Sequence, residues 1–427
     1  LRFPEFIEEW EEKRLGDMST NIMYGIGSAA IKYDGVNKYL RITDIDDSSR
    51  NFVPKPLTSP EGLIHNNYKL SDGDIVFART GASVGKSYLY KTSDGNLIFA
   101  GFLIKFNIIS ANPYFVYSNT FRHYYDNWVS VMSVRSGQPG INAEEYKLLP
   151  IGLPTKPEQQ QIALFLTSVD SKIEQLSKKQ ELLREYKKGL MQQIFSQAIR
   201  FHSKGTSSQA QGEIDDTPGQ PLLPNGNSPS GSDFPDWEEK KLGDITDLIT
   251  KGTTPTSVGY NFTTEGINFI KVESIKNFKI DIGSVPKISE ECHHHLKRSQ
   301  LKNNDIVFSI AGTLGRTAIV KNKDLPANTN QALSIIRLNR SQHILFVHYL
   351  LNLESIDKYI HRMLSVGAQP NLSLQQVGDI QLQLPSLLEQ SKITNFLSFI
   401  DSKIEQVGKQ LDESKQFKKA LLQQMFV

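Results

Sequence analysis

Two short segments of the chain resemble phosphate-binding loops. Gly81-Ala-Ser-Val-Gly-Lys-Ser87 follows a strand-like run, which is the usual context of a P-loop. A P-loop has four residues between its glycines, so that successive N–H groups wrap the phosphates. The first segment has three, and Gly312-Thr-Leu-Gly-Arg-Thr317 has two, with arginine in place of the lysine. We therefore expect tight glycine turns between paired strands, not nucleotide sites.

Three other segments fall short of a catalytic or metal site. Pro235-Asp-Trp-Glu-Glu-Lys240 resembles a nuclease signature, but its spacing cannot bring carboxylates from separate strands to one metal, so we expect an amphipathic segment anchored by its tryptophan. Cys292 and the adjacent histidines 293–295 have no ligand pair at zinc spacing nearby. Asn112-Pro-Tyr-Phe115 lacks the second proline of the motif that holds a flipped adenine in amino-methyltransferases. We find no catalytic constellation.

The remaining chemistry is that of a basic, polar surface. Between Ile267 and Lys323 the chain has ten Lys and Arg against five Asp and Glu, although the net charge of the whole chain is only +2. Glycine turns that carry cations and hydroxyls can present N–H groups and charge to a DNA phosphate. Charge runs are more often solvated faces, so this pattern alone does not establish nucleic-acid binding.

Length and composition indicate an ordinary globular protein. The chain has 427 residues, 38% hydrophobic and 22% charged, which suggests two or three domains and excludes a disordered or fibrous chain. It has no apolar run of the ~20 residues that a membrane helix needs, and no signal-peptide pattern. Cys292 is the single cysteine, which fits a reducing compartment. We expect a cytoplasmic protein, and residues preceding Leu1 because it is not a methionine.

The chain contains two copies of one plan. Asp170-Ser-Lys-Ile-Glu-Gln175 recurs unchanged at 401–406, and residues 186–195 return in similar form at 417–426. Similarity is close over 154–196 and 385–427 but is reduced to short islands before them. This favours a constant frame with a variable surface over an old duplication that drifted evenly. The other matches are Trp10–Asp17 with Trp237–Asp244, Asp74–Phe77 with Asp305–Phe308, Gln138 with Gln369, and Pro154 with Pro385.

The constant segments are predicted to be long helices with an apolar seam. Thr155-Lys-Pro-Glu158 and Ser386-Leu-Leu-Glu389 have the form of a capping box. The heptad seam is interrupted at Lys187 and Lys418, among other positions, and its period favours coiled-coil packing. We expect the two helices to pack antiparallel on each other. Parallel packing, or two amphipathic helices each packed on its own domain, remain alternatives. The seam residues are Leu166, Val169, Ile173, Leu176, Leu183, Leu190, Leu397, Ile400, Ile404, Val407, Leu411 and Leu421.

The variable segments are predicted to be mixed α/β. Residues 114–131 and 343–364 have helical patterns. Residues 203–233, rich in Gly, Ser, Pro and Gln, are predicted to form a flexible linker. The predicted strands are 38–43, 74–78, 97–106, 268–273, 305–309 and 317–320.

The whole chain resembles the specificity subunit of Type I restriction–modification systems. The resemblance rests on the Trp-x-x-x-x-Leu-Gly-Asp openings at 10–17 and 237–244, and on Lys251-Gly-Thr-Thr-Pro-Thr256. It also rests on the Asp-Ile-Val-Phe strands before the glycine turns, Gln369-Pro370-Asn371, and the repeated Asp-Ser-Lys-Ile-Glu-Gln helices. The first copy departs from the pattern at Met23-Tyr-Gly-Ile-Gly-Ser28, which leaves its loop residues uncertain.

The resemblance implies an α/β (mixed α+β) protein whose two pseudo-symmetric target-recognition domains are separated by an antiparallel pair of coiled-coil-like helices. The implied domains are a first recognition domain at 1–154, a helical region at 155–202, the linker at 203–233, a second recognition domain at 234–385 and a helical region at 386–427. The chain would not be an enzyme by itself. Each recognition domain would read one half of a bipartite double-stranded DNA site.

The family also implies partners. Two adenine-methylating modification subunits would bind the helices, and restriction and translocase subunits would join them. S-adenosylmethionine, ATP and Mg would belong to those partners, with no cofactor, metal or membrane for this chain. Two alternatives remain, a coiled-coil protein adaptor without DNA readout and a P-loop-like nucleotide-binding enzyme.

The candidate DNA-binding residues are cations, hydroxyls and amides of the variable halves. Arg41 and Lys271 occupy matching strand-like runs, and pairing with Asp44 or Glu273 is the structural alternative for them. The candidates are Arg41, Thr43, Arg79, Thr80, Lys86, Gln138, Lys251, Thr253, Thr254, Lys271, Thr313, Arg316, Gln369 and Asn371.

Overall fold

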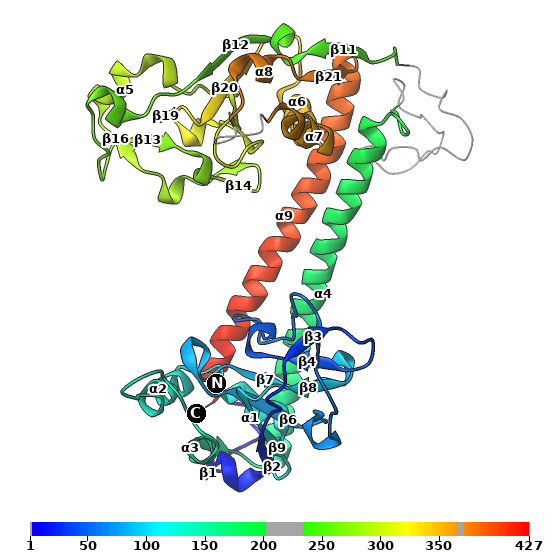
Figure 1. Cartoon of the computed structure of the whole chain (residues 1–427), viewed down its shortest axis with the longest axis vertical. Coiled ribbons are helices and arrows are strands. Elements are labelled where there is room, and N and C mark those ends of the chain that lie inside the picture. Colours follow the sequence, from blue (N-terminus) through cyan, green and yellow to red (C-terminus); the bar gives the residue numbers. More distant parts are fainter. Residues whose placement is uncertain (1, 202–233, 365–370, 427) are drawn as a thin grey trace. The chain divides into compact units, whose positions relative to one another are not determined.

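The chain folds into two compact units, each containing one copy of the repeat. The computed structural model describes residues 2–201, 234–364 and 371–426. Unit 1 comprises Leu1–Gln180 with Val407–Val427, and unit 2 comprises Glu181–Gln406 (Figure 1). The linker predicted at 203–233 lies outside the described residues.

Unit 1 is built on an antiparallel four-stranded sheet in the order β2-β9-β6-β7. The central strand β6 is buried along its whole length, and its apolar side chains pack on both faces of the sheet. Two-stranded sheets β3-β5, β4-β8 and β1-β10 surround it. The strands are β1 (Glu11–Arg14), β2 (Ser19–Tyr24), β3 (Ala30–Lys32), β4 (Lys38–Leu40), β5 (Thr58–Pro60), β6 (Asp74–Ala78), β7 (Ser87–Leu89), β8 (Leu97–Phe99), β9 (Leu103–Ile108) and β10 (Pro150–Leu153).

Unit 2 repeats this plan with an antiparallel sheet in the order β12-β20-β17-β18. A three-stranded sheet, β16-β13-β19, takes the place of β4-β8, and β11 pairs with β21 as β1 pairs with β10. The strands are β11 (Glu238–Lys241), β12 (Thr246–Lys251), β13 (Ile267–Ile270), β14 (Ile275–Lys276), β15 (Lys279–Ile280), β16 (Lys287–Ile288), β17 (Ile306–Ser309), β18 (Thr317–Ile319), β19 (Ala327–Thr329), β20 (Leu333–Leu338) and β21 (Gln381–Leu384).

Short helices cover the sheets. The segments 114–131 and 343–364 are helical, as predicted, and each consists of two helices. A side chain at each break bonds to the sheet: Thr120 Oγ1 lies 2.7 Å from Ser87 Oγ, and Thr317 Oγ1 donates to Asn352 Oδ1 at 2.8 Å. These hydrogen bonds fix the chain between the two helices to strands β7 and β18. The helices are α1 (Pro113–Asn119), α2 (His123–Met132), α3 (Ala143–Lys147), α5 (Glu290–His295), α6 (Ile344–Leu350), α7 (Glu354–Met363) and α8 (Leu374–Gly378).

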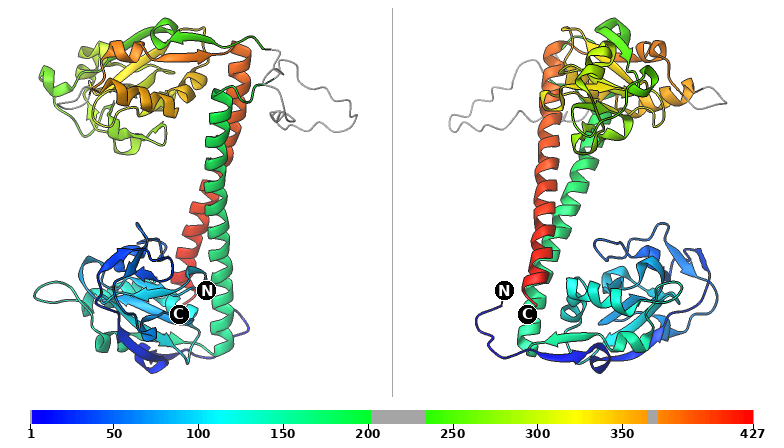
Figure 2. Two further views of the ribbon diagram at one scale, coloured as in Figure 1. Left: turned by 45° about the vertical axis from the view of Figure 1, so that its right-hand side comes forward. Right: turned by 90° about the vertical axis from the view of Figure 1, so that its left-hand side faces the viewer.

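Two long helices, α4 (Lys156–Phe195) and α9 (Leu387–Gln424), each contribute a stretch to both units. Within each unit the two stretches lie side by side and antiparallel (Figures 1 and 2). In unit 1, Leu166 packs in one cluster with Leu421, and in unit 2, Leu190 packs with Leu397. All twelve predicted seam residues are buried or half-buried. The seam and its antiparallel pairing are therefore confirmed within the units.

The two glutamates of the expected capping boxes have another role. Glu158 accepts hydrogen bonds from Arg2 Nε at 2.7 Å and Arg2 Nη2 at 2.8 Å. Glu389 accepts from Arg200 Nε at 3.2 Å and Arg200 Nη2 at 2.9 Å. Both carboxylates are fully buried, and a buried carboxylate is stabilised more by a paired cation than by a helix-end N–H group. The capping prediction was wrong for these side chains, although Glu389 N–H does donate to Ser386 Oγ at 3.4 Å.

Candidate nucleic-acid interface

Most of the DNA-contact residues predicted for unit 1 lie at one end of the strands of its sheet. Strands β2 and β6 end there while β7 and β9 begin, because Tyr24 pairs with Ile104 and Ala78 pairs with Leu103. The edge therefore consists of the glycine turn 79–86, the turn 100–102, and the chain that follows Tyr24. We call it the unit 1 edge.

The glycine turn of the unit 1 edge is held by two buried tyrosines. Tyr146 OH donates to Ala78 O at 2.8 Å and accepts from Gly85 N at 3.1 Å. Tyr125 OH donates to Gly85 O at 2.7 Å. Burial raises the pKa of both tyrosines, which therefore stay protonated. Gly85 has a φ of 86°, and a Cβ there would lie 2.7 Å from Val129 Cγ1. The turn is thus a fixed structural element, as the spacing of its glycines predicts.

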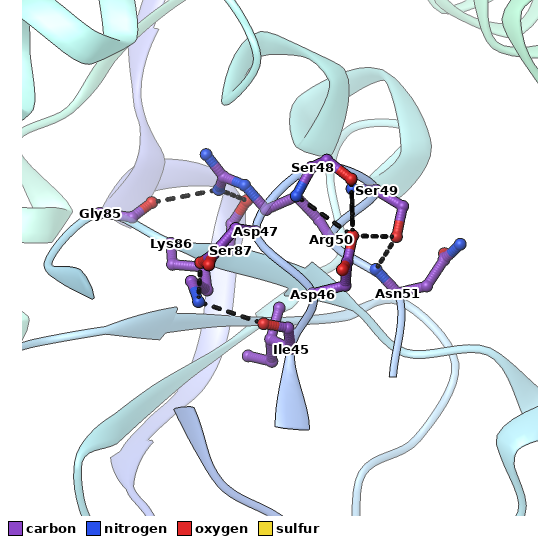
Figure 3. Close-up of polar contacts among 10 residues, drawn as sticks. All are labelled: Ile45, Asp46, Asp47, Ser48, Ser49, Arg50, Asn51, Gly85, Lys86 and Ser87. Atoms are coloured by element: carbon purple, nitrogen blue, oxygen red, sulfur yellow. Dashed lines mark hydrogen bonds and ion pairs between the residues drawn. The ribbon is translucent and has the colours of Figure 1, made fainter. Parts of the chain in front are cut away.

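Lys86, the lysine of the segment that resembles a P-loop, has a hydrogen bond and an ion pair to other residues of unit 1 (Figure 3). Lys86 Nζ donates to Ile45 O at 3.1 Å and forms an ion pair with Asp47. In the same loop, Arg50 Nη1 donates to Ser87 Oγ at 3.1 Å. Only 11% of the Lys86 side chain is exposed. Its ammonium group is therefore engaged by Ile45 O and Asp47.

Asp46 organises the loop that reaches Lys86 (Figure 3). Asp46 Oδ1 accepts from Ser49 N at 2.7 Å and Ser49 Oγ at 2.8 Å, and from Ser48 N and Oγ at 3.1 and 2.8 Å. These hydrogen bonds, that from Ser49 N–H first, hold the pKa of Asp46 well below its usual range. The carboxylate is thus charged at any physiological pH, and the loop keeps its shape.

Arg41 forms the ion pair that was its structural alternative. It directly follows β4, and its Nε and Nη2 donate to Asp44 Oδ2 and Oδ1 at 2.8 and 2.7 Å. Its counterpart Lys271 follows β13 and places Nζ 4.6 Å from the ring centroid of Phe262. Thr43 is exposed beside the Arg41–Asp44 pair. Arg41 is thus engaged in the fold, whereas Lys271 is held against an aromatic ring.

Arg79, Thr80 and Gln138 come together at the unit 1 edge. Thr80 forms a β-bridge with Gly140, and Gly81 N donates to Pro139 O at 3.0 Å, which brings Gln138 beside the turn. Arg79 Cζ lies 5.0 Å from the ring centroid of Tyr24 and 6.0 Å from that of Phe102. Tyr24 and Phe102 were not predicted as site residues. Aromatic residues at strand ends are the signal that could have indicated them.

The unit 2 edge is built in the same place with other residues. Lys251 ends β12 opposite Ser334, and Ser309 ends β17 opposite Leu333. The glycine turn 310–316 is fixed by Ser309 Oγ, which donates to Thr313 O at 2.6 Å and accepts from Arg316 N at 2.7 Å. A serine hydroxyl thus does what the tyrosines do in unit 1. Lys251, Thr313 and Arg316 are exposed on or beside these strand ends.

The threonines that follow β12 face a second cation. Thr253 Oγ1 accepts from Arg298 Nη2 at 3.3 Å, and Thr254 Oγ1 hydrogen-bonds Gln331 Oε1. Arg298 was not among the predicted site residues. Asn371 forms a β-bridge with Ala311 in the glycine turn, while Gln369 lies outside the described residues.

A pair of glycines resolves the apparent departure of the first copy from the Lys-Gly-Thr-Thr-Pro-Thr motif. A Cβ at Gly252 would lie 1.9 Å from Thr329 O, and a Cβ at Gly25 would lie 2.2 Å from Ala100 O. In both units the chain after the first sheet strand therefore passes too close to a carbonyl for any other residue. Gly25 is the structural counterpart of Gly252, although the residues around it differ.

The other segments considered for chemistry are parts of the fold. Asn112 caps α1, where its side chain accepts from Phe115 N at 3.0 Å. Trp237 is a buried anchor beside β11, as expected. His293 Nδ1 hydrogen-bonds Asn328 Oδ1, and burial raises the pKa of Cys292. Among the described residues there is no group of three or more His, Cys, Asp and Glu that could hold a metal ion.

Comparisons with known proteins identify the family. The model of the Type I restriction modification DNA specificity domain matches residues 7–184 and 235–413. The chain belongs to this family. The Type I restriction enzyme MjaVIII specificity subunit of Methanocaldococcus jannaschii is 25% identical over 99% of this chain and 92% of its own. As a specificity subunit of a Type I restriction–modification system, the chain has a role in DNA sequence specificity.

Solved structures of this class share the fold. The S subunit of a Type I restriction–modification system from M. genitalium superposes with a TM-score of 0.56 at 15% identity, over 100% of this chain and 97% of that one. A chain from a study of complex assembly and conformational transition of the type I R-M system gives 0.54 at 17% identity, over 98% and 97%. Within the described part of this specificity subunit, no helix is long and apolar enough to cross a membrane.

Proposed function

We propose that the two units each read one half of a bipartite double-stranded DNA site, through the unit 1 and unit 2 edges. In this proposal the chain does no chemistry itself. It directs adenine methylation by modification subunits, and cleavage by restriction and translocase subunits, to the site that it binds. S-adenosylmethionine, ATP and Mg belong to those partners, and the complex works in the cytoplasm.

One observation carries the proposal: the frame of each unit repeats the same side-chain contacts, whereas the side chains presented at the two edges differ. Asn112 N donates to Gln159 Oε1 at 2.9 Å, and His343 N donates to Gln390 Oε1 at 2.9 Å. The Arg2–Glu158 and Arg200–Glu389 pairs are likewise equivalent. At the edges, by contrast, Tyr24 and Lys251 end equivalent strands. A frame kept constant around a variable surface suits two readers with different targets.

Identical exposed residues on the two long helices support the binding of the same partner protein at both copies of the repeat. Lys172 and Gln175 are exposed on α4, and their counterparts Lys403 and Gln406 are exposed and identical on α9. Packing inside the units does not require these exposed side chains to be identical. A protein that docks in the same way on both copies would require it, as two modification subunits would.

The proposal is tested by exchanging one recognition half. The chain is expressed with its modification subunits, with residues 1–153 replaced by those of a relative, and the methylated sites are mapped by sequencing. We expect one half of the site to change and the other to stay. The reciprocal exchange of residues 234–384 is the matched control and should change the other half. If either exchange altered both halves, or neither, the two-reader proposal would be wrong.

A second experiment separates this proposal from a protein adaptor that binds no DNA. Binding of the full chain to duplex DNA is measured by filter retention over a series of salt concentrations. Phosphate contacts release counterions, so we expect log K to fall linearly with log salt concentration. Absence of binding at low salt would favour the adaptor.

A further inference from the structure

Arg79 is the one predicted DNA-contact residue of unit 1 whose guanidinium is held in place by aromatic rings. We propose that Arg79 reads a guanine in the half-site of unit 1, and that Tyr24 and Phe102 are its positioning residues. This inference rests on the proposed function. In unit 2 the residue at the position equivalent to Arg79 is Ile310. One half of the DNA site, and not the other, then depends on this arginine.

The Tyr24 ring and the backbone of Phe102 are held by hydrogen bonds. Tyr24 OH accepts a hydrogen bond from Ala143 N, at the start of α3, at 3.1 Å. Arg79 N donates to Phe102 O at 3.1 Å, and Ile141 N donates to Arg79 O at 2.9 Å. The arginine and the Phe102 turn are therefore joined through the backbone. Contact with two rings restricts the guanidinium before any ligand arrives, so less side-chain entropy is lost when it binds.

The side-chain hydrogen-bond donors of Arg79 have no partner among the described residues. Arg2, Arg41 and Arg135 of the same unit each bind a carboxylate. Arg79 forms no ion pair with a described residue, and its buried Nε has no hydrogen-bond partner among them. A buried donor without an acceptor costs free energy, so it calls for an explanation. An acceptor supplied by a ligand is such an explanation.

The surroundings of Arg79 fit a duplex surface. Phe102 is 60% exposed and Tyr24 is 39% exposed, so both residues reach the surface of the edge. Gln138, a neutral hydrogen-bonding side chain, lies exposed beside the same turn. The edge thus presents aromatic, amide and guanidinium groups together, which are the groups that contact base edges.

Guanine is the base that this group fits best. The guanidinium fork donates two parallel hydrogen bonds, and in the major groove guanine alone offers the O6 and N7 acceptors side by side. A phosphate can also accept two parallel hydrogen bonds from the fork, but it is the same at every position of the duplex and carries no sequence information. The salt dependence of binding separates the two contacts, because loss of a phosphate contact weakens binding to every duplex and lowers the salt slope.

The same place in unit 2 lacks the arginine. The residue that follows β17, as Arg79 follows β6, is Ile310, and it is 4% exposed. The strand end equivalent to Tyr24 is occupied by Lys251. If the two half-sites are read by these edges, the arginine–guanine contact is therefore restricted to the half read by unit 1.

The first test maps the methylated sites of cells that carry the full complex with wild-type chain, Arg79→Ala, Arg79→Lys or the control Arg135→Ala. Arg135 is an arginine of the same unit that binds Glu145. We expect Arg79→Ala to admit other bases at a single guanine, in the half-site that exchange of residues 1–153 also changes. Arg79→Lys should admit other bases there in part, and Arg135→Ala not at all.

The second test measures binding of the full chain to a duplex of its site and to one in which that guanine is 7-deazaguanine, which lacks the N7 acceptor. Wild type should lose about 10-fold in affinity for the modified duplex, a typical discrimination for a bidentate pair. Arg79→Ala should bind both duplexes equally. Phe102→Ala should reduce the discrimination while leaving the melting temperature unchanged, and Phe102→Tyr should restore it.

Failure of this inference is distinct from failure of the proposed function. If wild type selected no bipartite site, the proposed function would fail. If wild type were selective but Arg79→Ala broadened no position, or broadened one in the half-site of unit 2, only the assignment of Arg79 would fail. A uniform loss of affinity on every duplex with a smaller salt slope would make Arg79 a phosphate contact and overturn the inference. If Arg79→Ala does not fold, Arg79→Lys replaces it: partial broadening at one guanine of the unit 1 half-site supports the inference, and unchanged selectivity overturns it.

Discussion

Lys187 Nζ donates to both carboxylate oxygens of Asp401, at 2.6 and 2.8 Å. Tyr349 OH donates to the same carboxylate at 2.7 Å, and Lys187 Nζ lies 4.7 Å from the tyrosine ring centroid. Unit 1 contains the same trio, in which Lys418 and Tyr114 both bond to Asp170. This trio explains why a lysine interrupts the apolar seam at equivalent positions of the two helices.

The first prediction concerns this ion pair. Lys187→Met keeps most of the apolar stem but removes the charge, so it should lower the free energy of unfolding. A double-mutant cycle with Asp401→Ala, followed by urea denaturation, should give a coupling of roughly 1 kcal/mol, because Asp401 is 44% exposed and solvent screens the pair. Lys188→Met, at an exposed neighbouring position, is the control and should have little effect. Equal losses in Lys187→Met and Lys188→Met would refute the role of the pair.

The second prediction concerns the apolar seam. Leu176 is 5% exposed and Leu182, on the same helix, is 51% exposed. Leu176→Glu buries an unpaired carboxylate, which should cost roughly 3 kcal/mol or more and cause unfolding or aggregation. Leu182→Glu leaves its carboxylate in water and should melt like wild type. Thermal melting and the yield of soluble chain measure both, and a normally melting Leu176→Glu would show that the seam is not packed as described.

The repeat and the helical seam could be predicted from the sequence because both are local periodic patterns. Leu166, for example, is recognised as a seam residue by its heptad spacing from Val169 and Ile173. The partner of Glu158 could not be predicted, because Arg2 lies far away in the sequence and only folding brings the two together. The capping-box pattern suggested a local partner, but burial made the distant cation the better one.

The candidate site was only partly predictable for the same reason. The glycine turns follow from their residues, and the structure places Arg79, Thr80 and Gln138 together. Whether a cation is available to a ligand depends instead on its tertiary neighbours. Arg41 has a carboxylate within reach and Arg79 has two aromatic rings, a difference that no local pattern of charges displays.

The third prediction is that the purified chain neither binds nor hydrolyses ATP. Gly85 N–H is bonded to Tyr146, and Lys86 Nζ is bonded to Ile45 O and Asp47, so the groups that would grip a phosphate are engaged. Isothermal titration with Mg-ATP and a phosphate-release assay should give no signal above buffer. Lys86→Ala is the matched variant and should leave that result unchanged. ATP turnover that followed the chain through purification and was lost in Lys86→Ala would restore the nucleotide-binding alternative.

The fourth prediction concerns pH and rests on His348, on the sheet-facing side of α6. Burial lowers the pKa of His348 to about 4, and Lys187 and Lys321 act in the same direction. The ordinary value for an unfolded histidine is about 6.5, so between these values the unfolded chain binds more protons than the folded one. The free energy of unfolding should therefore fall as pH drops below about 6.5, by roughly 3 kcal/mol in all by pH 4.

His348→Gln separates this effect from the other groups that titrate in the same range. The variant has no proton to take up, so its melting temperature should fall less than that of wild type between pH 7 and pH 5. Burial also lowers the pKa of His343, which remains in the variant and sets a residual dependence of the same sign. His361→Gln, at an exposed position, should keep the full wild-type dependence. If His348→Gln and wild type lost stability in parallel over this range, the neutral buried histidine would not be the source of the acid sensitivity.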